Sequence, residues 1–172
     1  MQRDFVDWVI QRSTEERPDL DLSSIEIVGR LLRISGLLEQ RFERLCDEYG
    51  FGFWAFTVLT ALRRTGRPYR LTPRQLQSAG MVSAAAVTKR VTRLEELGLV
   101  ERTPDPTDRR GTLVGLTKHG LEVIDELVVR YLEEERSVVD GLSDKDRAAL
   151  ARLLRGLLLR LEGPRTGPTR RR

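Results

Sequence analysis

Apolar residues recur every three or four positions through most of the chain, a spacing that places them on one face of an α-helix. The pattern predicts three helices in the first part of the chain, over Asp4–Arg12, from Ser23 to about Gly50, and over Phe53–Arg64. Ser23 and Glu26 have the spacing of a capping box, so we expect the second helix to begin there.

Two short helices are expected next, separated by a turn that contains Gly80. Thr72 precedes Pro73, which suits an N-cap followed by the first helical residue, and this helix should end near Ser78. Ser83 caps the following helix, which ends at Gly98. A short helix, a turn and a capped helix in this order are typical of a helix-turn-helix.

The chain then changes from helical spacing to short runs of β-forming residues. Leu99–Thr103 and Thr112–Leu116 are the expected strands, and "PDPTDRRG" between them is a hairpin loop. Two long amphipathic helices follow, beginning at Thr117 and at Ser143. The segment 163–172 lacks apolar residues and is expected to be disordered.

The terminal helices carry more apolar residues than one chain can cover. Leu154, Leu157, Leu158 and Leu161 have few partners left, so we expect them to pack against a second copy. The predicted organisation is an N-terminal helix and first dimerisation helix over 1–48, a winged helix-turn-helix over 53–116, C-terminal dimerisation helices over 117–162 and a basic tail over 163–172. The expected fold class is mainly α with a small β-hairpin wing.

The distribution of charge is more informative than the net charge of +4. Four of the 30 basic residues are arginines of the tail, so the remaining 26 balance the 26 acidic residues. From Tyr49 through Leu94 there is no Asp or Glu. The basic residues within this run are Arg63, Arg64, Arg67, Arg70, Arg74, Lys89, Arg90 and Arg93. An acid-free basic segment in a chain of balanced charge indicates a surface that meets a polyanion.

The helix after Ser83 can be divided by its phase into a buried and an outward side. Val87, Val91 and Leu94 fall together at 100° per residue. The residues that point away from them are Ala85, Lys89, Thr92 and Arg93. Small residues near its start allow close approach to base edges, and the cations reach phosphates or guanine. The candidate DNA-binding residues of this helix are Ser83, Ala85, Ala86, Thr88, Lys89, Thr92 and Arg93. Arg109 and Arg110 in the hairpin loop suit a narrow A·T-rich minor groove.

Several function classes are disfavoured by what the sequence lacks. It has no apolar run long enough to span a membrane and no secretory signal pattern, and its lone Cys46 cannot form an intramolecular disulfide, so a cytoplasmic location is expected. Cys46 as a thiol sensor would need a lowered pKa, and packing is the simpler role. His119 is the only histidine, so no metal site and no cofactor are expected. No enzyme motif is present, so catalysis is not expected.

The segment "RLEELGLVERTPDPTDRRGTLVGLTKHG" resembles the signature of the MarR family of dimeric winged helix-turn-helix regulators. The resemblance covers roughly residues 25–160. It implies a homodimer with intertwined terminal helices and two recognition helices in successive major grooves of a palindromic operator on double-stranded DNA. It also implies a transcriptional regulator, usually a repressor, that a small aromatic or anionic ligand or thiol oxidation releases from a promoter.

The extra N-terminal helix and "FTVLTALRRTGRPYRLTP" resemble a narrower, urate-responsive branch of that family. The branch has a tryptophan on the added helix, an aspartate and an arginine on the helix before the helix-turn-helix, and two further arginines, on the recognition helix and after the first wing strand. By position these fall on Trp8, Thr57, Arg64, Arg90 and Arg102. Thr57 departs from the branch, because it cannot carry the charge of the aspartate.

This departure predicts a weakened or altered response to urate. A carboxylate at this position could accept hydrogen bonds from the N–H groups of a ligand ring, or repel a recognition-helix arginine once the charge of the ligand arrives. Thr57 carries no charge and cannot replace the carboxylate in either role. Titrating urate into a protein–DNA complex tests this expectation. Release at low urate concentration would contradict it.

Other interpretations of the same residues remain open at this stage. Trp8 could serve packing, Arg64 and Arg102 could be salt-bridge partners, and Arg90 could hold a phosphate. The protein could be a constitutive winged-helix DNA binder, or a winged-helix module that binds another protein and has no ligand switch. The salt dependence of the binding affinity distinguishes a protein-binding module from a DNA binder, since only the affinity for DNA falls steeply as the salt concentration rises.

Overall fold

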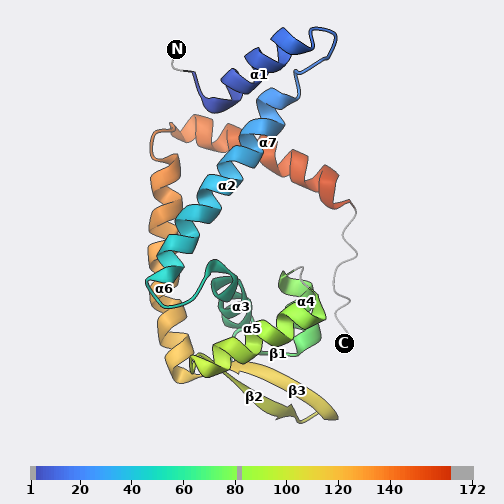
Figure 1. Cartoon of the computed structure of the whole chain (residues 1–172). Coiled ribbons are helices and arrows are strands. Elements are labelled where there is room, and N and C mark those ends of the chain that lie inside the picture. Colours follow the sequence, from blue (N-terminus) through green and yellow to red (C-terminus); the bar gives the residue numbers. More distant parts are fainter. Residues whose placement is uncertain (1–2, 81–82, 164–172) are drawn as a thin grey trace. The chain divides into compact units, whose positions relative to one another are not determined.

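The computed structural model describes residues 3–80 and 83–163, without the side chains of Arg109 and Arg110. The chain divides into two compact units, residues 1–129 and 130–172, which are taken in turn below. The elements are α1 (Phe5–Glu16), α2 (Ile25–Asp47), α3 (Phe53–Arg64), β1 (Arg70–Leu71), α4 (Pro73–Gly80), α5 (Ala84–Glu96), β2 (Val100–Asp105), β3 (Asp108–Leu116), α6 (Lys118–Val139) and α7 (Asp144–Glu162) (Figure 1). Among the described residues, no helix has the length and hydrophobicity needed to cross a bilayer.

The fold class is confirmed: the described chain is mainly helical, with one small antiparallel sheet in the order β1-β3-β2. The β2 and β3 strands form the wing, and they are longer than expected because only two residues separate them. Strand β1 was not predicted. It has two residues, Arg70 opposite Gly115 and Leu71 opposite Val114, too few to produce an alternating pattern in the sequence.

The core of the first unit lies where α3, α4 and α5 pack against one another and against the sheet. Its fully buried side chains come from four elements that the apolar spacing had already identified. They include Leu59, Leu62, Val91, Leu94, Val114, Ile124 and Leu127. Figure 1 shows α5 lying alongside the β2–β3 hairpin, so the packing of one helix sets the position of both expected DNA-contacting elements.

Among the glycines that the structure describes, Gly120 makes the closest backbone contact, at the junction between β2 and α6. The Thr117 N–H donates to the carbonyl oxygen of Leu99 at 3.1 Å, and the Thr117 hydroxyl donates to that of Gly98 at 2.7 Å. Gly120, in the first turn of α6, lies directly against Leu99. A Cβ added at Gly120 would be 1.9 Å from the Leu99 carbonyl oxygen, so only glycine fits there.

Three of the expected helix caps are present. The Thr72 hydroxyl accepts from the Gln75 N–H at 3.2 Å while the Gln75 side chain accepts from the Thr72 N–H at 2.8 Å. The Ser83 hydroxyl accepts from the Ala86 N–H at 3.3 Å, and that of Ser143 caps α7. These bonds satisfy backbone donors that have no partner within the helix.

Two expectations about the N-terminal region are wrong. The first helix continues to Glu16, one turn beyond Arg12. The second begins at Ile25 without a side-chain cap, so Ser23 and Glu26 form no capping box. The reason is local: the Asp21 carboxylate accepts the Ser23 N–H at 2.9 Å and holds that residue in the preceding turn.

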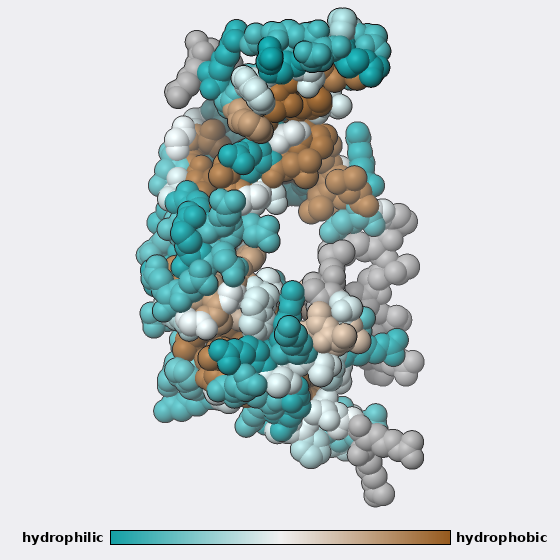
Figure 2. Space-filling model, in the orientation of Figure 1, coloured by the Kyte–Doolittle hydropathy of each residue, from teal (hydrophilic) through white to brown (hydrophobic). Residues whose placement is uncertain are grey.

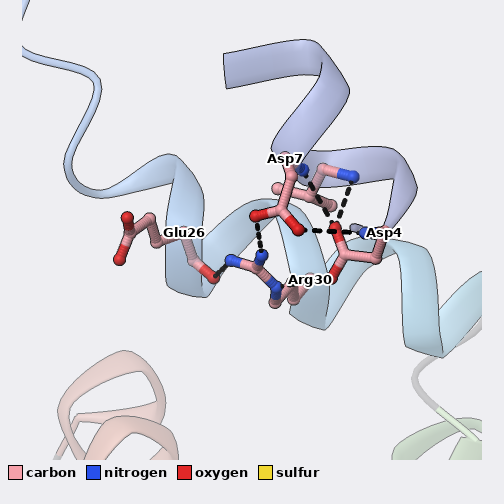
Figure 3. Close-up of polar contacts among 5 residues, drawn as sticks. Asp4, Asp7, Glu26 and Arg30 are labelled. Carbon is pink, nitrogen blue, oxygen red and sulfur yellow. Dashed lines mark hydrogen bonds and ion pairs between the residues drawn. The ribbon is translucent and has the colours of Figure 1, made fainter. Parts of the chain in front are cut away.

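A capping box is found instead at the start of α1, and it is joined to α2. The Asp4 carboxylate accepts from the Asp7 N–H, and the Asp7 carboxylate accepts from the Asp4 N–H, both at 2.9 Å. From α2, Arg30 reaches Asp4 at 2.8 Å and Asp7 at 2.5 Å (Figure 3). The Asp7 N–H and Arg30 lower the pKa of Asp4, and beneath them the buried Val6 packs against Gly29.

The second unit contains the end of α6 and all of α7. No residue of α7 is buried, although one face carries Leu150, Leu153, Leu154, Leu157, Leu158 and Leu161. Figure 2 shows hydrophobic side chains gathered on α7, whereas the surface of α5 and the wing is largely hydrophilic. An apolar stripe of this length on a monomer is typical of an interface.

Candidate nucleic-acid interface

Helix α5 has the phase that its sequence predicted. Val87, Val91 and Leu94 are buried against the core. Ala85, Lys89, Thr92 and Arg93 are exposed, and we call these four residues the outward face of α5. The first residue of this face, Ala85, has a small side chain, so the start of the α5 backbone can approach a flat or grooved partner closely.

The polar side chains near the start of α5 are partly used by the helix itself. The Ser83 hydroxyl is the N-cap acceptor, and the Thr88 hydroxyl donates to the Ala84 carbonyl at 3.2 Å. Ala86 is half-buried, whereas Lys89 is exposed and makes no ion pair with any described residue. Of this group, Lys89 is therefore the one with a free charge for an incoming anion.

The wing and α5 are tied together by Arg102. From β2, this arginine forms an ion pair with Glu95 and donates to the Thr92 hydroxyl at 3.1 Å. Glu95 is the first carboxylate after the acid-free run. Its pairing with Arg102 compensates a negative charge on the helix that carries the outward face.

Replacing Arg102 with alanine is expected to weaken binding to a labelled DNA duplex by about tenfold or less, the range of one exposed ion pair together with like-charge repulsion. The loss has two causes: the wing is no longer held to Thr92, and the Glu95 charge is left uncompensated near phosphates. Fluorescence anisotropy measures the affinity. Glu95→Gln in the Arg102→Ala background should recover part of it, and no recovery would rule out the charge contribution.

The turn at the tip of the wing is held by Asp105. Its carboxylate accepts from the Thr107 hydroxyl at 2.7 Å and from the Thr107 N–H at 2.8 Å, and these bonds lower the pKa of Asp105. Arg109 and Arg110 follow this turn in β3, but their side chains lie outside the described part of the structure. Their role as minor-groove contacts stays a prediction.

Three cations of the acid-free run form ion pairs with carboxylates that lie outside the run. Arg63 pairs with Asp125 at 2.6 Å and lies over the Tyr69 ring, Arg70 pairs with Glu101 at 3.3 Å, and Arg93 pairs with Glu96 at 2.9 Å. Four exposed ones make no ion pair with any described residue, namely Arg64, Arg67, Arg74 and Lys89. The excess of positive charge on this unit is therefore only partly compensated.

Among the described residues, no hydrogen bond, ion pair or ring contact joins any two of the five residues suggested for ligand binding. Trp8 on α1 is 57% exposed and stacks on Phe5, with 5.8 Å between ring centroids. The Thr57 hydroxyl donates to the Trp54 carbonyl at 2.7 Å, and Arg64 is exposed at the end of α3. Arg102 is held by α5, as described above. The ligand assignments of these residues stay predictions.

Arg90, the fifth of them, lies beside a tryptophan that the sequence did not single out. Its guanidinium carbon is 6.0 Å from the ring centroid of Trp54. Trp54, Lys89, Arg90 and Arg93 line an open pocket of about 260 Å³, the Trp54 pocket. Trp54 precedes Thr57 by one helical turn, and this spacing was the one feature of the sequence that could have suggested Trp54. The contact between Trp54 and Arg90 itself depends on the packing of α3 against α5.

Cys46 is wholly buried, and its pKa is raised to about 12 by that burial and by the charges of Glu43 and Asp47. At pH 8 the native thiol is therefore neutral, whereas in an unfolded chain it ionises near pH 8.5. We expect a thiol reagent such as Ellman's reagent to react at least ~100-fold more slowly with the native protein than with the protein in urea. Comparable rates in the two states would contradict burial of the thiol and reopen a sensor role.

The described residues contain no cluster of side chains able to hold a metal ion, and His119 is exposed at the start of α6. The arrangement as a whole is that of a DNA-contacting module. A helix with a cationic outward face stands beside a β-hairpin whose turn is followed by two arginines.

The comparisons with known proteins agree with this arrangement. The sequence model of the MarR family matches residues 49–111. The HTH-type transcriptional regulator PecS of Dickeya dadantii is 33% identical over 85% of this chain and 88% of its own.

Among solved structures, AbsC of Streptomyces coelicolor, a MarR family transcriptional regulator, is 26% identical with a TM-score of 0.74, covering 84% of this chain and 97% of its own. BpsR of Bordetella bronchiseptica, whose DNA binding is regulated by 6-hydroxynicotinic acid, is 30% identical with a TM-score of 0.64, covering 77% and 94%. These similarities agree with the buried and outward sides of α5 and with the wing beside it. The chain belongs to the MarR family of DNA-binding transcriptional regulators.

Proposed function

We propose that this regulator is a homodimeric repressor that binds a palindromic operator through α5 and the wing of each subunit. The observation that carries the proposal is the outward face of α5. It presents Lys89 and Arg93 to solvent, while Val87, Val91 and Leu94 hold the other side of the helix in the core. Two such helices related by a two-fold axis would read two half-sites about one helical turn of DNA apart.

Dimerisation is supported by the apolar residues that remain exposed. On α7 they form the leucine stripe, and on α2 they include Ile27, Val28 and Leu32. We propose that residues 1–48 and 117–162 supply the dimer interface and residues 53–116 the DNA-binding domain. A second copy is the natural cover, because both stripes belong to the same chain and isologous interfaces are self-complementary.

Release from DNA is proposed to follow binding of a small aromatic or anionic ligand. The related BpsR is regulated by 6-hydroxynicotinic acid, a planar molecule with a carboxyl group. The present chain offers arginines and a tryptophan near α5 to such a molecule. Residues Trp8, Thr57, Arg64, Arg90 and Arg102 remain candidates by their likeness to the urate-responsive branch.

Selection of duplexes from a random library, followed by footprinting on the selected DNA, tests the function. We expect protection of a palindrome in two successive major grooves, and an affinity that falls steeply as salt rises. Lys89→Ala should lower the affinity on every sequence and reduce the salt slope by about one.

Lys145→Ala is the matched control, because Lys145 is a lysine in the first turn of α7 that should change neither quantity. A protein that selects no sequence, or whose affinity ignores salt, is not the proposed repressor. The second result would favour a protein-interaction module.

A further inference from the structure

We propose that Glu96 is a positioning residue for DNA recognition, which holds the guanidinium of Arg93 so that this arginine reads a guanine base. The inference rests on the proposed function, since α5 must be the helix that enters the major groove. It gives the two cations of the outward face of α5 different roles: Arg93 selects the sequence, whereas Lys89 binds phosphate on every sequence alike.

The ion pair between Arg93 and Glu96 uses one edge of the guanidinium. The Nη1 atom of Arg93 donates to the Oε2 atom of Glu96 at 2.9 Å, three residues further along the same helix. Both side chains are more than half exposed, so the pair lies at the surface that DNA would meet. A guanidinium carries several N–H donors in one rigid plane, and a bond through one nitrogen leaves the remaining donors of that plane for a base.

The charges one turn away on either side act on the Arg93 guanidinium in the same direction. Lys89 lies four positions before Arg93 and Arg90 three positions before it, and like charges at these spacings repel each other on a helix. Glu96, three positions after Arg93, attracts it. The guanidinium is therefore directed toward the C-terminal end of α5, and its orientation is restricted before DNA arrives.

Neither the stability of the helix nor attraction to DNA explains a carboxylate at position 96. Glu96 is the last residue of α5, where a negative charge opposes the helix dipole, and it would also repel nearby phosphates. The charge of the neighbouring Glu95 is compensated by Arg102 from the wing. A residue that breaks a local rule of helix design tends to mark a functional position, and the contact with Arg93 indicates what that function is.

The geometry of a restrained guanidinium favours guanine over the other bases. Two parallel N–H groups of an arginine match the O6 and N7 atoms of guanine in the major groove. An arginine that is already oriented loses less rotamer freedom when it makes these two bonds, so the correct base gains more of the contact energy. Lys89 forms no ion pair with a described residue and carries a compact charge on a flexible stem, which suits a phosphate.

The test measures base preference separately from affinity. The full chain first selects duplexes from a random library. Anisotropy then gives the Kd for the selected palindrome, for palindromes with one base pair changed symmetrically in both half-sites, and for a duplex of random sequence. We expect one guanine in each half-site whose replacement raises the Kd of the wild type about tenfold or more. Arg93→Ala should bring this ratio of Kd values close to one.

Glu96→Gln should change affinity and base preference in opposite senses. Loss of the negative charge should lower the Kd for the random duplex about twofold, whereas the preference for guanine should fall to about threefold or less because Arg93 is no longer held. Combining Glu96→Gln with Arg93→Ala should give the same preference as Arg93→Ala alone, since the two residues act as one unit. Glu122→Gln is the matched control: it removes the carboxylate of another exposed helical ion pair, with Lys118 on α6, and should leave the preference unchanged.

An equal change of Kd on every sequence in Glu96→Gln would reduce Glu96 to a simple charge and overturn the inference. A guanine preference that survives Arg93→Ala would make Arg93 a phosphate contact and overturn it as well. Both results leave the proposed function intact, whereas a wild type that selects no sequence overturns the inference and the proposed function together. Thermal melting of each variant checks that the fold is retained, and Glu96→Ala repeats the test if Glu96→Gln melts early.

Discussion

Gly120→Ala is expected to destabilise the protein by about 3 kcal/mol or more, the upper range of overpacking a tight contact. The added Cβ would lie 1.9 Å from the Leu99 carbonyl oxygen and 2.8 Å from its carbon, both backbone atoms. Relief requires the start of α6 to move away from β2, which would strain the hydrogen bonds of Thr117 to Leu99 and Gly98. The sign of the effect is diagnostic, because helix propensity alone would make alanine more stable than glycine by about 1 kcal/mol.

Chemical denaturation at a fixed protein concentration measures this change in the free energy of unfolding. His119→Ala is the matched control, since it alters the neighbouring exposed residue of the same turn and should stay within about 0.5 kcal/mol of the wild type. If Gly120→Ala were as stable as the wild type, the contact between α6 and β2 would be looser than the structure shows.

The second large effect is expected from Leu157→Glu, which should convert the dimer to a monomer. Leu157 is 37% exposed and lies within the leucine stripe of α7. A carboxylate buried there without a partner costs several kcal/mol, so the dimer Kd should rise by roughly 100-fold or more. Because a monomer loses the effective concentration of its second recognition helix, affinity for a palindrome should fall by about 10²–10⁴-fold.

Sedimentation analysis measures the oligomeric state, and anisotropy with a selected palindrome measures the affinity. Ala148→Glu adds the same charge to the opposite side of α7, where Ala148 is exposed, so it should leave both quantities close to wild type. A Leu157→Glu protein that remains dimeric would show that the stripe is not the interface. Retained palindrome affinity in a monomer would instead remove the need for two recognition helices.

The parts of the fold that follow a local period could be predicted from the sequence. The buried side of α5, its cap at Ser83 and the outward positions of Lys89 and Arg93 all follow from residues within one helix. The wing strands were found by composition, although their length was underestimated because Pro104 and Asp105 resemble loop residues. Asp105 in fact accepts both hydrogen bonds of the turn and extends β2 to it.

The features that sequence reasoning missed depend on contacts between distant segments. Arg30 meets Asp4 across 26 positions, and no local pattern marks that pair. Trp54 became a candidate only once α3 was packed against α5 beside Arg90. Arg102 was assigned to a ligand by resemblance, with a salt bridge as the alternative. The structure shows its ion pair with Glu95 and its hydrogen bond to Thr92, whose positions relative to β2 the sequence did not give, and the ligand role stays a prediction.

The two-residue strand β1 has a mechanical consequence. It joins the end of α3 to α4 and is hydrogen-bonded to β3, the strand that carries Arg109 and Arg110. A displacement at the C-terminal end of α3 that residues 65–69 do not absorb would therefore either break this short ladder or be passed to β3. Strand β1 thus links the helix that bears Trp54 to the strand that bears the wing arginines, and it begins six positions after α3 ends at Arg64.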